Sequence, residues 1–353
     1  MMIPFILKQY GFAENACVIA PFGTGLINNT WLITCNSKKY ILQRINQNVF
    51  KNPAAIDDNI KKLATYLQQH YPAYVFTVPV NTLTGDTLIL NGDGAFRLFE
   101  FVEGSRTYDV LQQPQQAYEA AKQFGRFTRL LSGFNTESLN ITLPQFHDLS
   151  LRYNQFLQAV DNGNKERIAH AEPLVQCLKQ FDVLVKIFEE IQTNGAFKKR
   201  VTHHDTKISN VLFDEHDKGI CVIDLDTVMP GYFISDVGDI MRTYLSPAGE
   251  NEPDLTQVYI RDEYFDAVME GYLGEMKEEL SNIETGAFVY AGQFMIYMQA
   301  LRFLADYFNN DVYYGAQYPL HNYNRAANQI VLLEELVKKE DVFKAKVRAF
   351  MAG

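Results

Sequence analysis

The stretch VTHHDTKISNVLFD, residues 201–214, places a dense group of polar side chains between two apolar runs. His203, Asp205 and Asn210 lie after the run VT and just before the run VLF. Short β-branched and apolar runs bounded by polar turn residues are typical of strands. The stretch therefore predicts a strand, a polar loop and a second strand.

The polar residues follow the spacing H-x-D-x-x-x-x-N, and a further apolar run, ICVID, ends at Asp224. A hairpin between the two runs would return Asp224 to the loop. Kinase-type phosphoryl transfer needs a carboxylate that receives the proton of the attacking hydroxyl, and an amide oxygen and a second carboxylate that hold Mg²⁺. A polar loop that only ends two strands is the alternative. The aspartate at the end of the following run favours the functional interpretation.

Composition excludes several classes of partner. The chain has 353 residues, of which 47% are hydrophobic, and a formal net charge of −10. A core of this size fits two or three domain-sized units. The largest basic cluster is FKKR at 197–200, so neither nucleic acid nor an anionic membrane is an expected partner. No apolar run reaches the ~18 residues that a membrane helix needs.

The four cysteines are Cys17, Cys35, Cys177 and Cys221, and none of them forms a C-x-x-C pair. Scattered cysteines in a chain of this length predict reduced thiols and a cytoplasmic location. The start, MMIPFILKQYGF, has no basic segment before its apolar residues and no small-residue cleavage site, so no signal peptide is expected. The sequence does not indicate an oligomeric state.

The predicted secondary structure changes from mainly strands to mainly helices after about one hundred residues. Strands are predicted over 16–22, 29–35, 40–45, 74–80, 86–90 and 95–102, with one helix over 54–70. Long helical patterns follow over 115–134, 172–192, 258–276, 286–308 and 324–339, and short strand candidates lie only over 200–226. We predict an α+β fold, with a small β-rich part over 1–103 and a larger, mainly helical part over 104–353.

Two segments, THHDTKISNVLFD and VIDLDTVMPGYFISDVGDIMR, resemble the aminoglycoside phosphotransferase and choline kinase superfamily, and within it the N-acetylhexosamine 1-kinase group. The similarity extends to FGTGLINNTWLI, YILQRIN, FRLFEFVEGSRTYD and LRFLADYFNNDVYYG. It implies a bilobal, protein-kinase-like fold, with a small antiparallel N-lobe that carries one helix and a larger helical C-lobe. ATP would bind between the lobes.

The resemblance also implies roles for the polar loop. Asp205 corresponds to the catalytic base, Asn210 and Asp224 to the magnesium ligands, and His203 to the support of the loop backbone. Asp226 is open between a second metal, the substrate and a simple strand end. Lys207 is expected to face the transferred phosphate, with a solvated surface lysine as the alternative.

Two aspartates downstream, Asp236 and Asp239, are expected at the start of a helix. There they would cap free N–H groups and support the polar loop.

The nucleotide side carries weaker signals. Gly23 and Gly25 lie between two predicted strands and would let the backbone approach phosphates, although an ordinary hairpin also needs glycine. Choline kinases tend to have arginine where protein kinases place a third-strand lysine, so Arg44 is the candidate, with Asp57 or Asp58 unassigned as its partner. The segment LFEFVEG should be the hinge that meets adenine through the backbone of Glu100, Phe101 and Val102.

The acceptor side is predicted from LRFLADYF, which places Arg302 and Asp306 four residues apart on one helical face. A surface ion pair is the alternative. An apolar, aromatic helix is a costly place for an unpaired guanidinium, which favours Arg302 in the site. Tyr313 belongs to the aromatic residues nearby, which pack in cores and also stack on sugar rings.

The first hypothesis is an ATP- and Mg²⁺-dependent kinase that phosphorylates the anomeric hydroxyl of an N-acetylhexosamine, a small-molecule substrate. A kinase for choline, homoserine or an aminoglycoside is the alternative within the same chemistry. A catalytically silent nucleotide-binding regulator is the alternative from another class.

Overall fold

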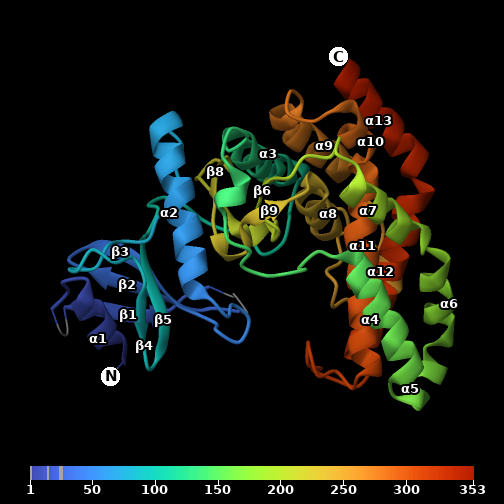
Figure 1. Ribbon diagram of the computed structural model, residues 1–353, viewed down its shortest axis with the longest axis horizontal. Helices are drawn as coiled ribbons and strands as arrows, with labels where there is room; N and C mark the ends of the chain where they lie inside the picture. Colours follow the sequence, from blue (N-terminus) through green and yellow to red (C-terminus); the bar gives the residue numbers. More distant parts are fainter. Residues whose placement is uncertain (1, 14–15, 24–26) are drawn as a thin grey trace.

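The computed structural model describes residues 2–13, 16–23 and 27–353 of the chain. A β sheet forms one end of the molecule and a bundle of helices forms the other (Figure 1). This is the α+β arrangement that the sequence predicts. The predicted division at residue 103 falls in the connection between β5 (Gly94–Glu100) and α3 (Pro114–Leu130), and it stays a prediction.

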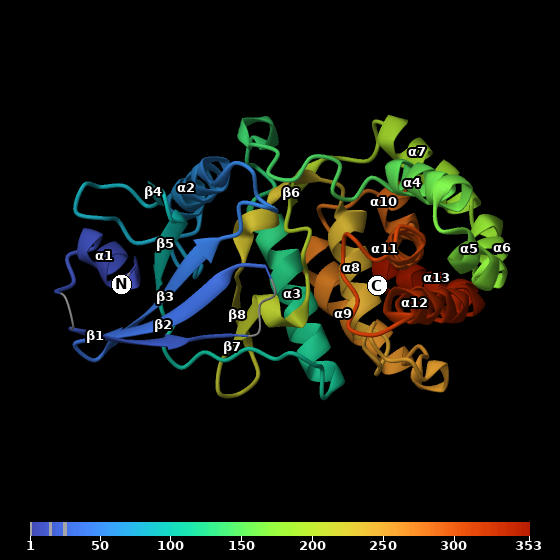
Figure 2. The ribbon, with the colours of Figure 1, turned by 90° about the horizontal axis from the view of Figure 1, so that it is seen from below.

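The N-terminal sheet is antiparallel, with the strand order β1-β2-β3-β5-β4. Figure 2 shows the sheet at one end, with α3 between it and the C-terminal helices. Successive side chains of a strand point to opposite faces. On one face, Leu42, Phe96 and Leu98 pack against Ile6 and Leu7 of the first helix. The other elements of this part are α1 (Met2–Gln9), β1 (Cys17–Pro21), β2 (Asn29–Cys35), β3 (Lys38–Ile45), α2 (Pro53–His70) and β4 (Ile89–Asn91).

Helix α2 is the single long helix expected in this region. It begins at Pro53, where the Asn52 side chain accepts a backbone N–H of the first turn (3.3 Å) and proline has no N–H to leave unpaired. Its predicted apolar face is buried: Ile56, Ile60, Leu63 and Leu67. Asn59 donates to the carbonyl oxygens of Asn140 (2.9 Å) and Val228 (3.1 Å), which ties α2 to the C-terminal part.

The strand predicted over 74–80 is wrong. Only Pro79 in this segment makes a β-bridge, to Phe99. Proline has no N–H to donate to a ladder. Val75 and Val78 would lie on opposite faces of a strand, yet they are 44% and 43% exposed, so neither face is buried throughout.

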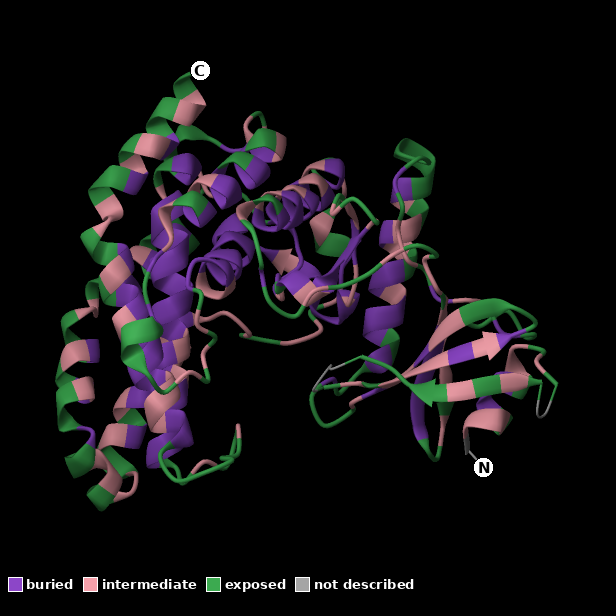
Figure 3. Ribbon diagram, turned by 180° about the vertical axis from the view of Figure 1, so that it is seen from behind, coloured by how far each residue is buried: buried purple, intermediate pink, exposed green. Residues whose placement is uncertain are grey.

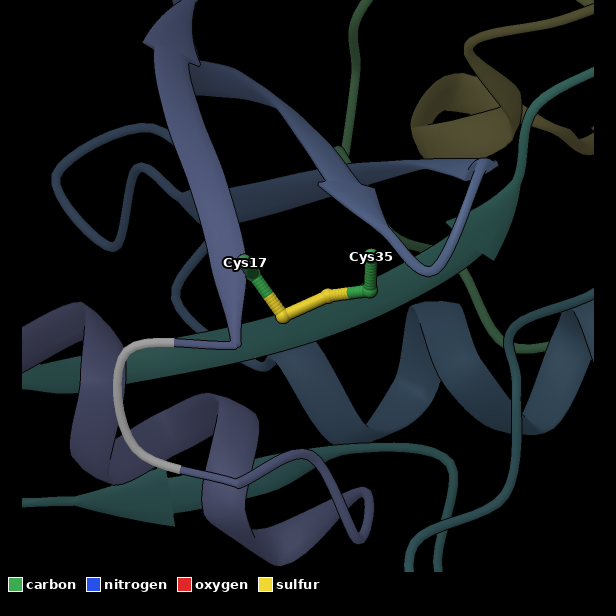
Figure 4. Close-up of a disulfide and its surroundings, with 2 residues drawn as sticks. All are labelled: Cys17 and Cys35. Atoms are coloured by element: carbon green, nitrogen blue, oxygen red, sulfur yellow. A yellow bond between two sulfur atoms is a disulfide. The ribbon is translucent and has the colours of Figure 1, made fainter.

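The prediction of four reduced cysteines is also wrong for two of them. Cys17 and Cys35 are register partners at the open ends of β1 and β2, and their sulfur atoms form a disulfide (Figure 4). The sequence does not show this pairing because it depends on how the two strands align. Cys177 and Cys221 are free thiols, and burial raises the pKa of Cys221 to about 12.

The C-terminal helices pack around one apolar helix, α11, which is buried along most of its length (Figure 3). It contacts α4, α8 and α12. Among the described residues, no helix combines the length and apolar character needed to cross a membrane. The helices are α4 (Leu149–Asn162), α5 (Lys165–His170), α6 (Glu172–Gln180), α7 (Val183–Thr193), α8 (Phe233–Tyr244), α9 (Asp262–Met276), α10 (Asn282–Gly286), α11 (Phe288–Phe308), α12 (His321–Lys338) and α13 (Glu340–Ala352).

A small β insert carries the polar stretch of the sequence. Strands β6 (Arg200–Thr202) and β9 (Met229–Gly231) pair with each other, and β7 (Val211–Phe213) pairs with β8 (Gly219–Val222). Residues 203–210 connect β6 to β7 and are called here the 203–210 loop. The insert contacts α3 through β8 and α8 through β6, so it lies against these two helices.

Candidate active site

The 203–210 loop brings Asp205 and Asn210 into contact. A short 3-10 turn, Ile208–Asn210, folds the chain back on itself. Asn210 Nδ2 then donates to the backbone oxygen of Asp205 (2.9 Å) and to its carboxylate Oδ2 (3.0 Å). Lys207 Nζ lies 3.1 Å from the same Oδ2. The Asp205 carboxylate is thus held by an amide and an ammonium group.

Lys207 points along the solvent side of the loop, with 45% of its side chain exposed. Burial lowers the pKa of Lys207, but the carboxylates of Asp205, Asp224 and Asp239 together outweigh burial, and the pKa is raised. The lysine is therefore a permanent positive charge beside Asp205.

His203 lies in the core beneath the loop. Its ring Nε2 is 2.9 Å from the backbone oxygen of Ile223, and its ring packs edge-on against Phe124. Its Nδ1 accepts the backbone N–H of Asp205 (3.4 Å). Burial lowers the pKa of His203, so the ring is neutral and serves to hold the loop against the end of β8.

Two buried carboxylates bind the backbone of the loop from below. Asp236 accepts the N–H groups of His203 (3.0 Å) and His204 (2.7 Å), and Asp239 accepts that of Thr206 (2.8 Å). Helix α8 begins at Phe233, and no side chain caps its first N–H groups. The capping expected from Asp236 and Asp239 is therefore not found in this described helix. Both aspartates instead direct their oxygens at the loop. Burial raises the pKa of Asp236 to about 7, and the two N–H donors oppose this shift.

His204 adopts a left-handed backbone conformation (φ 68°) that turns Asp205 outward. Its ring Nδ1 bonds to Ser235 Oγ (2.7 Å), and its far edge packs on Gly231, where a Cβ atom would come within 2.4 Å. Burial lowers the pKa of His204 to about 3. The ring of His147 lies 5.4 Å from that of His204 and bonds to the same hydroxyl of Ser235.

Asp224 follows β8 in a left-handed conformation (φ 61°, ψ 61°), which bends the chain toward the 203–210 loop. Burial, then the charges of Asp226 and Asp205, raise its pKa to about 7. Three carboxylates within electrostatic range favour a bound cation. Among the described residues, no three His, Cys, Asp or Glu side chains form a metal site on their own. A magnesium ion here would therefore need Asn210, Asp224 and oxygens of a nucleotide.

Asp226 is almost completely buried; within the described part of the chain its Oδ1 has an ion-pair partner but no hydrogen bond, and its Oδ2 accepts one hydrogen bond. Arg97 Nη2 lies 2.5 Å from Oδ1, and Asn28 Nδ2 donates to Oδ2 (2.8 Å). Arg97 also donates from Nε (3.1 Å) and Nη2 (2.8 Å) to Gln43 Oε1. A strand residue of the N-terminal sheet thus pairs with the segment that follows the candidate metal ligand.

Arg44 does not join this cluster. It shares a face of β3 with Leu42, and its guanidinium carbon lies 5.9 Å from the ring centre of Phe96, next to Gly94. Asp57 bonds to Thr87 and Lys61, and Asp58 bonds to Lys62 and Asn140. The alternation of β3 signals this: Leu42 and Arg44 face one way, while Gln43 faces the other, opposite Arg97 in the β3–β5 register.

The nucleotide side is only partly described. Gly23 has a left-handed φ of 77°, which favours glycine, and Gly25 lies outside the described residues. The ring of Phe22 packs edge-on against Phe101 at 6.2 Å, so the end of β1 lies beside the predicted hinge. Phe101 donates its backbone N–H to Lys39 (3.1 Å). Glu100 ends β5, and Val102 begins the connection to α3, where its oxygen accepts from Ser105.

Arg302 lies on α11 among neutral partners. Its Nη1 donates to Gln299 (2.9 Å) and its Nη2 to the Tyr313 hydroxyl (3.4 Å), while its guanidinium lies over the ring of Tyr314 at 5.4 Å. The positive charge of Arg302 contributes to the lowered pKa of His147, after burial and the His204 ring. Arg302 is therefore within electrostatic range of His147, whose ring lies beside that of His204.

Asp306 does not pair with Arg302, although both lie on α11. It is buried and accepts the backbone N–H groups of Tyr313 (2.8 Å) and Tyr314 (2.9 Å) and the side chain of Asn322 (3.1 Å). It anchors residues 311–320, called here the 311–320 loop. Tyr313 itself is 74% exposed. Asp306 thus positions the two tyrosines through their backbone N–H groups.

The class of protein is defined by four features taken together. They are a small β sheet, a helical bundle, a loop that carries an aspartate and an asparagine, and a second aspartate after the following hairpin. Together they define a kinase-like phosphotransferase. The family model described as "Phosphotransferase enzyme family" matches residues 18–276, and the chain belongs to that family. The membership covers the sheet, the 203–210 loop and Asp224.

Solved structures similar to this chain share its fold at low sequence identity. An aminoglycoside phosphotransferase from Alicyclobacillus acidocaldarius is 15% identical, with a TM-score of 0.66 over 100% of this chain and 97% of the other. A spectinomycin phosphotransferase in complex with ADP and spectinomycin is 14% identical, with a TM-score of 0.61 over 96% and 97%. A choline kinase from Cryptosporidium parvum is 13% identical, with a TM-score of 0.59 over 100% and 99%.

Proposed function

We propose that the protein is an ATP- and Mg²⁺-dependent kinase that phosphorylates the C1 hydroxyl of an N-acetylhexosamine. The observation that carries the kinase chemistry is the Asp205 carboxylate, held by Asn210 and Lys207 in electrostatic range of Asp224. Asp205 orients the acceptor hydroxyl and receives its proton. An anomeric hydroxyl is more acidic than an ordinary alcohol, so this carboxylate is a sufficient base.

The nucleotide is proposed to bind between the sheet and the 203–210 loop. Asn210 and Asp224 supply hard oxygen ligands that suit magnesium, which would neutralise charge on the phosphates when bound. Arg97, in place of Arg44, is the proposed contact to phosphate. It is 1% exposed, and its Nη1 is a buried donor without a hydrogen-bond partner among the described residues. Asp226 is the partner of Arg97 and not a first ligand of the metal.

Gly23 and the backbone of Glu100, Phe101 and Val102 are the proposed contacts to the rest of ATP. The structural neighbour in complex with ADP supports a nucleotide in this fold. ATP as donor supports a cytoplasmic location. Reductants in that compartment would act on the Cys17–Cys35 disulfide.

The acceptor is proposed to lie between Arg302, Tyr313 and the 203–210 loop. Arg302 bonds only to neutral groups, Gln299 and Tyr313, among the contacts described above. Several fixed donors of a guanidinium match sugar oxygens, whereas a cationic acceptor such as choline would be repelled. The proposal of an N-acetyl sugar also rests on the similarity of LRFLADYFNNDVYYG to the hexosamine kinase segment.

A screen for ATP-dependent gain of phosphate tests the proposal. The protein is incubated with ATP, Mg²⁺ and, separately, N-acetylglucosamine, N-acetylgalactosamine, choline, homoserine and an aminoglycoside, and the products are measured by mass spectrometry. We expect phosphate on the N-acetyl sugars. Phosphate found only on choline, homoserine or the aminoglycoside would show that the acceptor is not an N-acetyl sugar. Phosphate on none of a broad panel would favour the catalytically silent regulator.

A further inference from the structure

The 203–210 loop and the 311–320 loop are joined by an unbroken path of ion pairs and hydrogen bonds. It starts at the backbone N–H of Thr206, which Asp239 Oδ2 accepts (2.8 Å). Arg242 donates from Nε (3.1 Å) and Nη2 (2.9 Å) to Oδ1 of the same carboxylate. One residue after the predicted base is thereby connected to a guanidinium on α8.

Glu250 is the centre of the path. Its Oε2 accepts from Arg242 Nη1 (2.8 Å), and its Oε1 accepts from Arg325 on α12. Arg325 then donates from Nη1 to Asn322 Oδ1 (3.1 Å). The guanidinium of Arg325 also stacks on the ring of Phe303, at 3.7 Å from the ring centre. Glu250 therefore bridges two cations that arrive from two different helices.

The path ends on the 311–320 loop. Asn322 Nδ2 donates to Asp306 Oδ2 (3.1 Å), Asp311 Oδ1 (2.9 Å) and the backbone oxygen of Gly315 (2.9 Å). Asp306 in turn holds the backbone of Tyr313 and Tyr314. The loop that carries Tyr313 is therefore oriented by the same network that holds Thr206.

Charge alternates along this path, and its members are largely removed from water. The side chains of Arg242, Glu250 and Arg325 are 12%, 26% and 11% exposed. Burial alone would raise the pKa of Glu250, but the guanidinium groups of Arg242 and Arg325 outweigh it and hold the pKa low. Buried ion pairs add little net stability, because desolvation cancels most of the attraction. Their fixed geometry, in contrast, transmits position between the two loops.

We infer that Glu250 is a positioning residue, which keeps the 311–320 loop and the acceptor that it contacts in register with Asp205. The inference rests on the proposed function, because it assigns the acceptor to the 311–320 loop. Glu250 touches neither the nucleotide residues nor the acceptor residues named above. Its loss should therefore act on acceptor use and leave ATP use largely unchanged.

The kinetic test compares three variants with the wild type, on whichever acceptor the wild type phosphorylates. For Glu250→Gln we expect kcat/KM for the acceptor to fall about 10-fold, within the range for residues that couple two sites, with KM for ATP changed less than twofold. Arg325→Met, which breaks the path but leaves Glu250 paired with Arg242, should show the same pattern. The matched control is Glu284→Gln, which breaks the buried pair with Arg200 (2.5 Å) away from the path; it should alter thermal stability without changing acceptor KM.

A double-mutant cycle separates positioning from general damage. Tyr313→Phe removes the Tyr313 hydroxyl. It should lower kcat/KM for the acceptor by a smaller factor in the Glu250→Gln background than in the wild type, because the loop is already displaced. Independent, multiplicative effects of the two substitutions would overturn the inference. So would equal losses for ATP and acceptor in both Glu250→Gln and Arg325→Met.

Hydrogen exchange tests the inference without any activity. The backbone N–H groups of Tyr313 and Tyr314 should exchange faster in Glu250→Gln and Arg325→Met, and that of Thr206 should exchange faster in Glu250→Gln, with no such change in Glu284→Gln. Unchanged exchange in residues 311–320 would contradict the inference even in a protein that phosphorylates a different acceptor. Absence of sugar phosphorylation by a wild type with this exchange behaviour would contradict only the proposed function.

Discussion

The 203–210 loop and the 311–320 loop differ in how they are held. Buried carboxylates of α8 accept three backbone N–H groups of the first loop, and buried His203 anchors it to the end of β8. The second loop is anchored at Asp306 and Asn322, and its Val312 and Tyr313 are 81% and 74% exposed. The first loop is held in one geometry, whereas the second exposes side chains that the proposed function assigns to acceptor binding. The difference suggests that phosphoryl transfer and acceptor choice are separable in this fold.

The largest effect should come from the rigid loop. Asp205→Asn keeps the size of the side chain and removes the charge that we propose receives the proton. We expect turnover to fall about 10²- to 10⁴-fold, the range for a positioned general base. ATP affinity and thermal unfolding should stay close to wild type. A variant with nearly full turnover would show that Asp205 only shapes the loop.

Arg97→Met should act next most strongly, on the nucleotide and also on thermal stability, because it leaves Asp226 buried without its guanidinium partner. A lost hydrogen bond to a charged group costs about 1.5–3 kcal/mol, so we expect KM for ATP to rise about 10- to 100-fold. Arg44→Met is the matched control, because Arg44 lies over Phe96 on the face of the sheet opposite to that of Arg97. A larger effect on ATP from Arg44→Met than from Arg97→Met would restore Arg44 as the phosphate contact.

Arg302→Met should act on the acceptor alone. We expect KM for the sugar to rise about 10-fold, the lower end of the range for a charged donor on a partly exposed group, with KM for ATP unchanged. The control is Arg126→Met, since Arg126 lies over Tyr74 at 5.4 Å as Arg302 lies over Tyr314. Unchanged KM and turnover in Arg302→Met would remove this residue from the acceptor site.

The smallest effect is a pH dependence of stability. Burial raises the pKa of Asp236 from 3.8 to about 7, so the folded protein keeps this proton at pH values where the unfolded chain has lost it. The contribution of Asp236 to the free energy of unfolding therefore falls as the pH rises from about 4 to 7. Urea unfolding at pH 5.5 and 7.5 should show a steeper decline for the wild type than for Asp236→Asn. Equal pH dependence would mean that Asp236 is ionised throughout.

The parts of the structure that depend on short sequence distances were predictable. The α+β fold is confirmed, and so is membership of the phosphotransferase superfamily. Asp205 and Asn210 lie five residues apart, so their spacing alone indicates that their side chains touch. One hairpin connects them to Asp224. The sequence also places Asp236 and Asp239 near the loop, although their oxygens face the loop and not the helix end.

The remaining contacts depend on pairings that spacing does not reveal. Arg97 reaches Gln43 through a strand register that joins residues 54 positions apart, and it reaches Asp226 across the two parts of the molecule. Asp306 is four residues from Arg302 on α11, but it turns inward to the 311–320 loop. The disulfide likewise follows from the alignment of β1 with β2.

The position of the phosphate in the product tests the central claim most directly. After incubation of the protein with ATP, Mg²⁺ and an N-acetylhexosamine, phosphorus–proton NMR shows which proton couples to the new phosphate. We predict coupling to the anomeric proton, as in a 1-phosphate, and loss of this product in Asp205→Asn. Coupling to the C6 methylene pair, or an unchanged yield in Asp205→Asn, would contradict it.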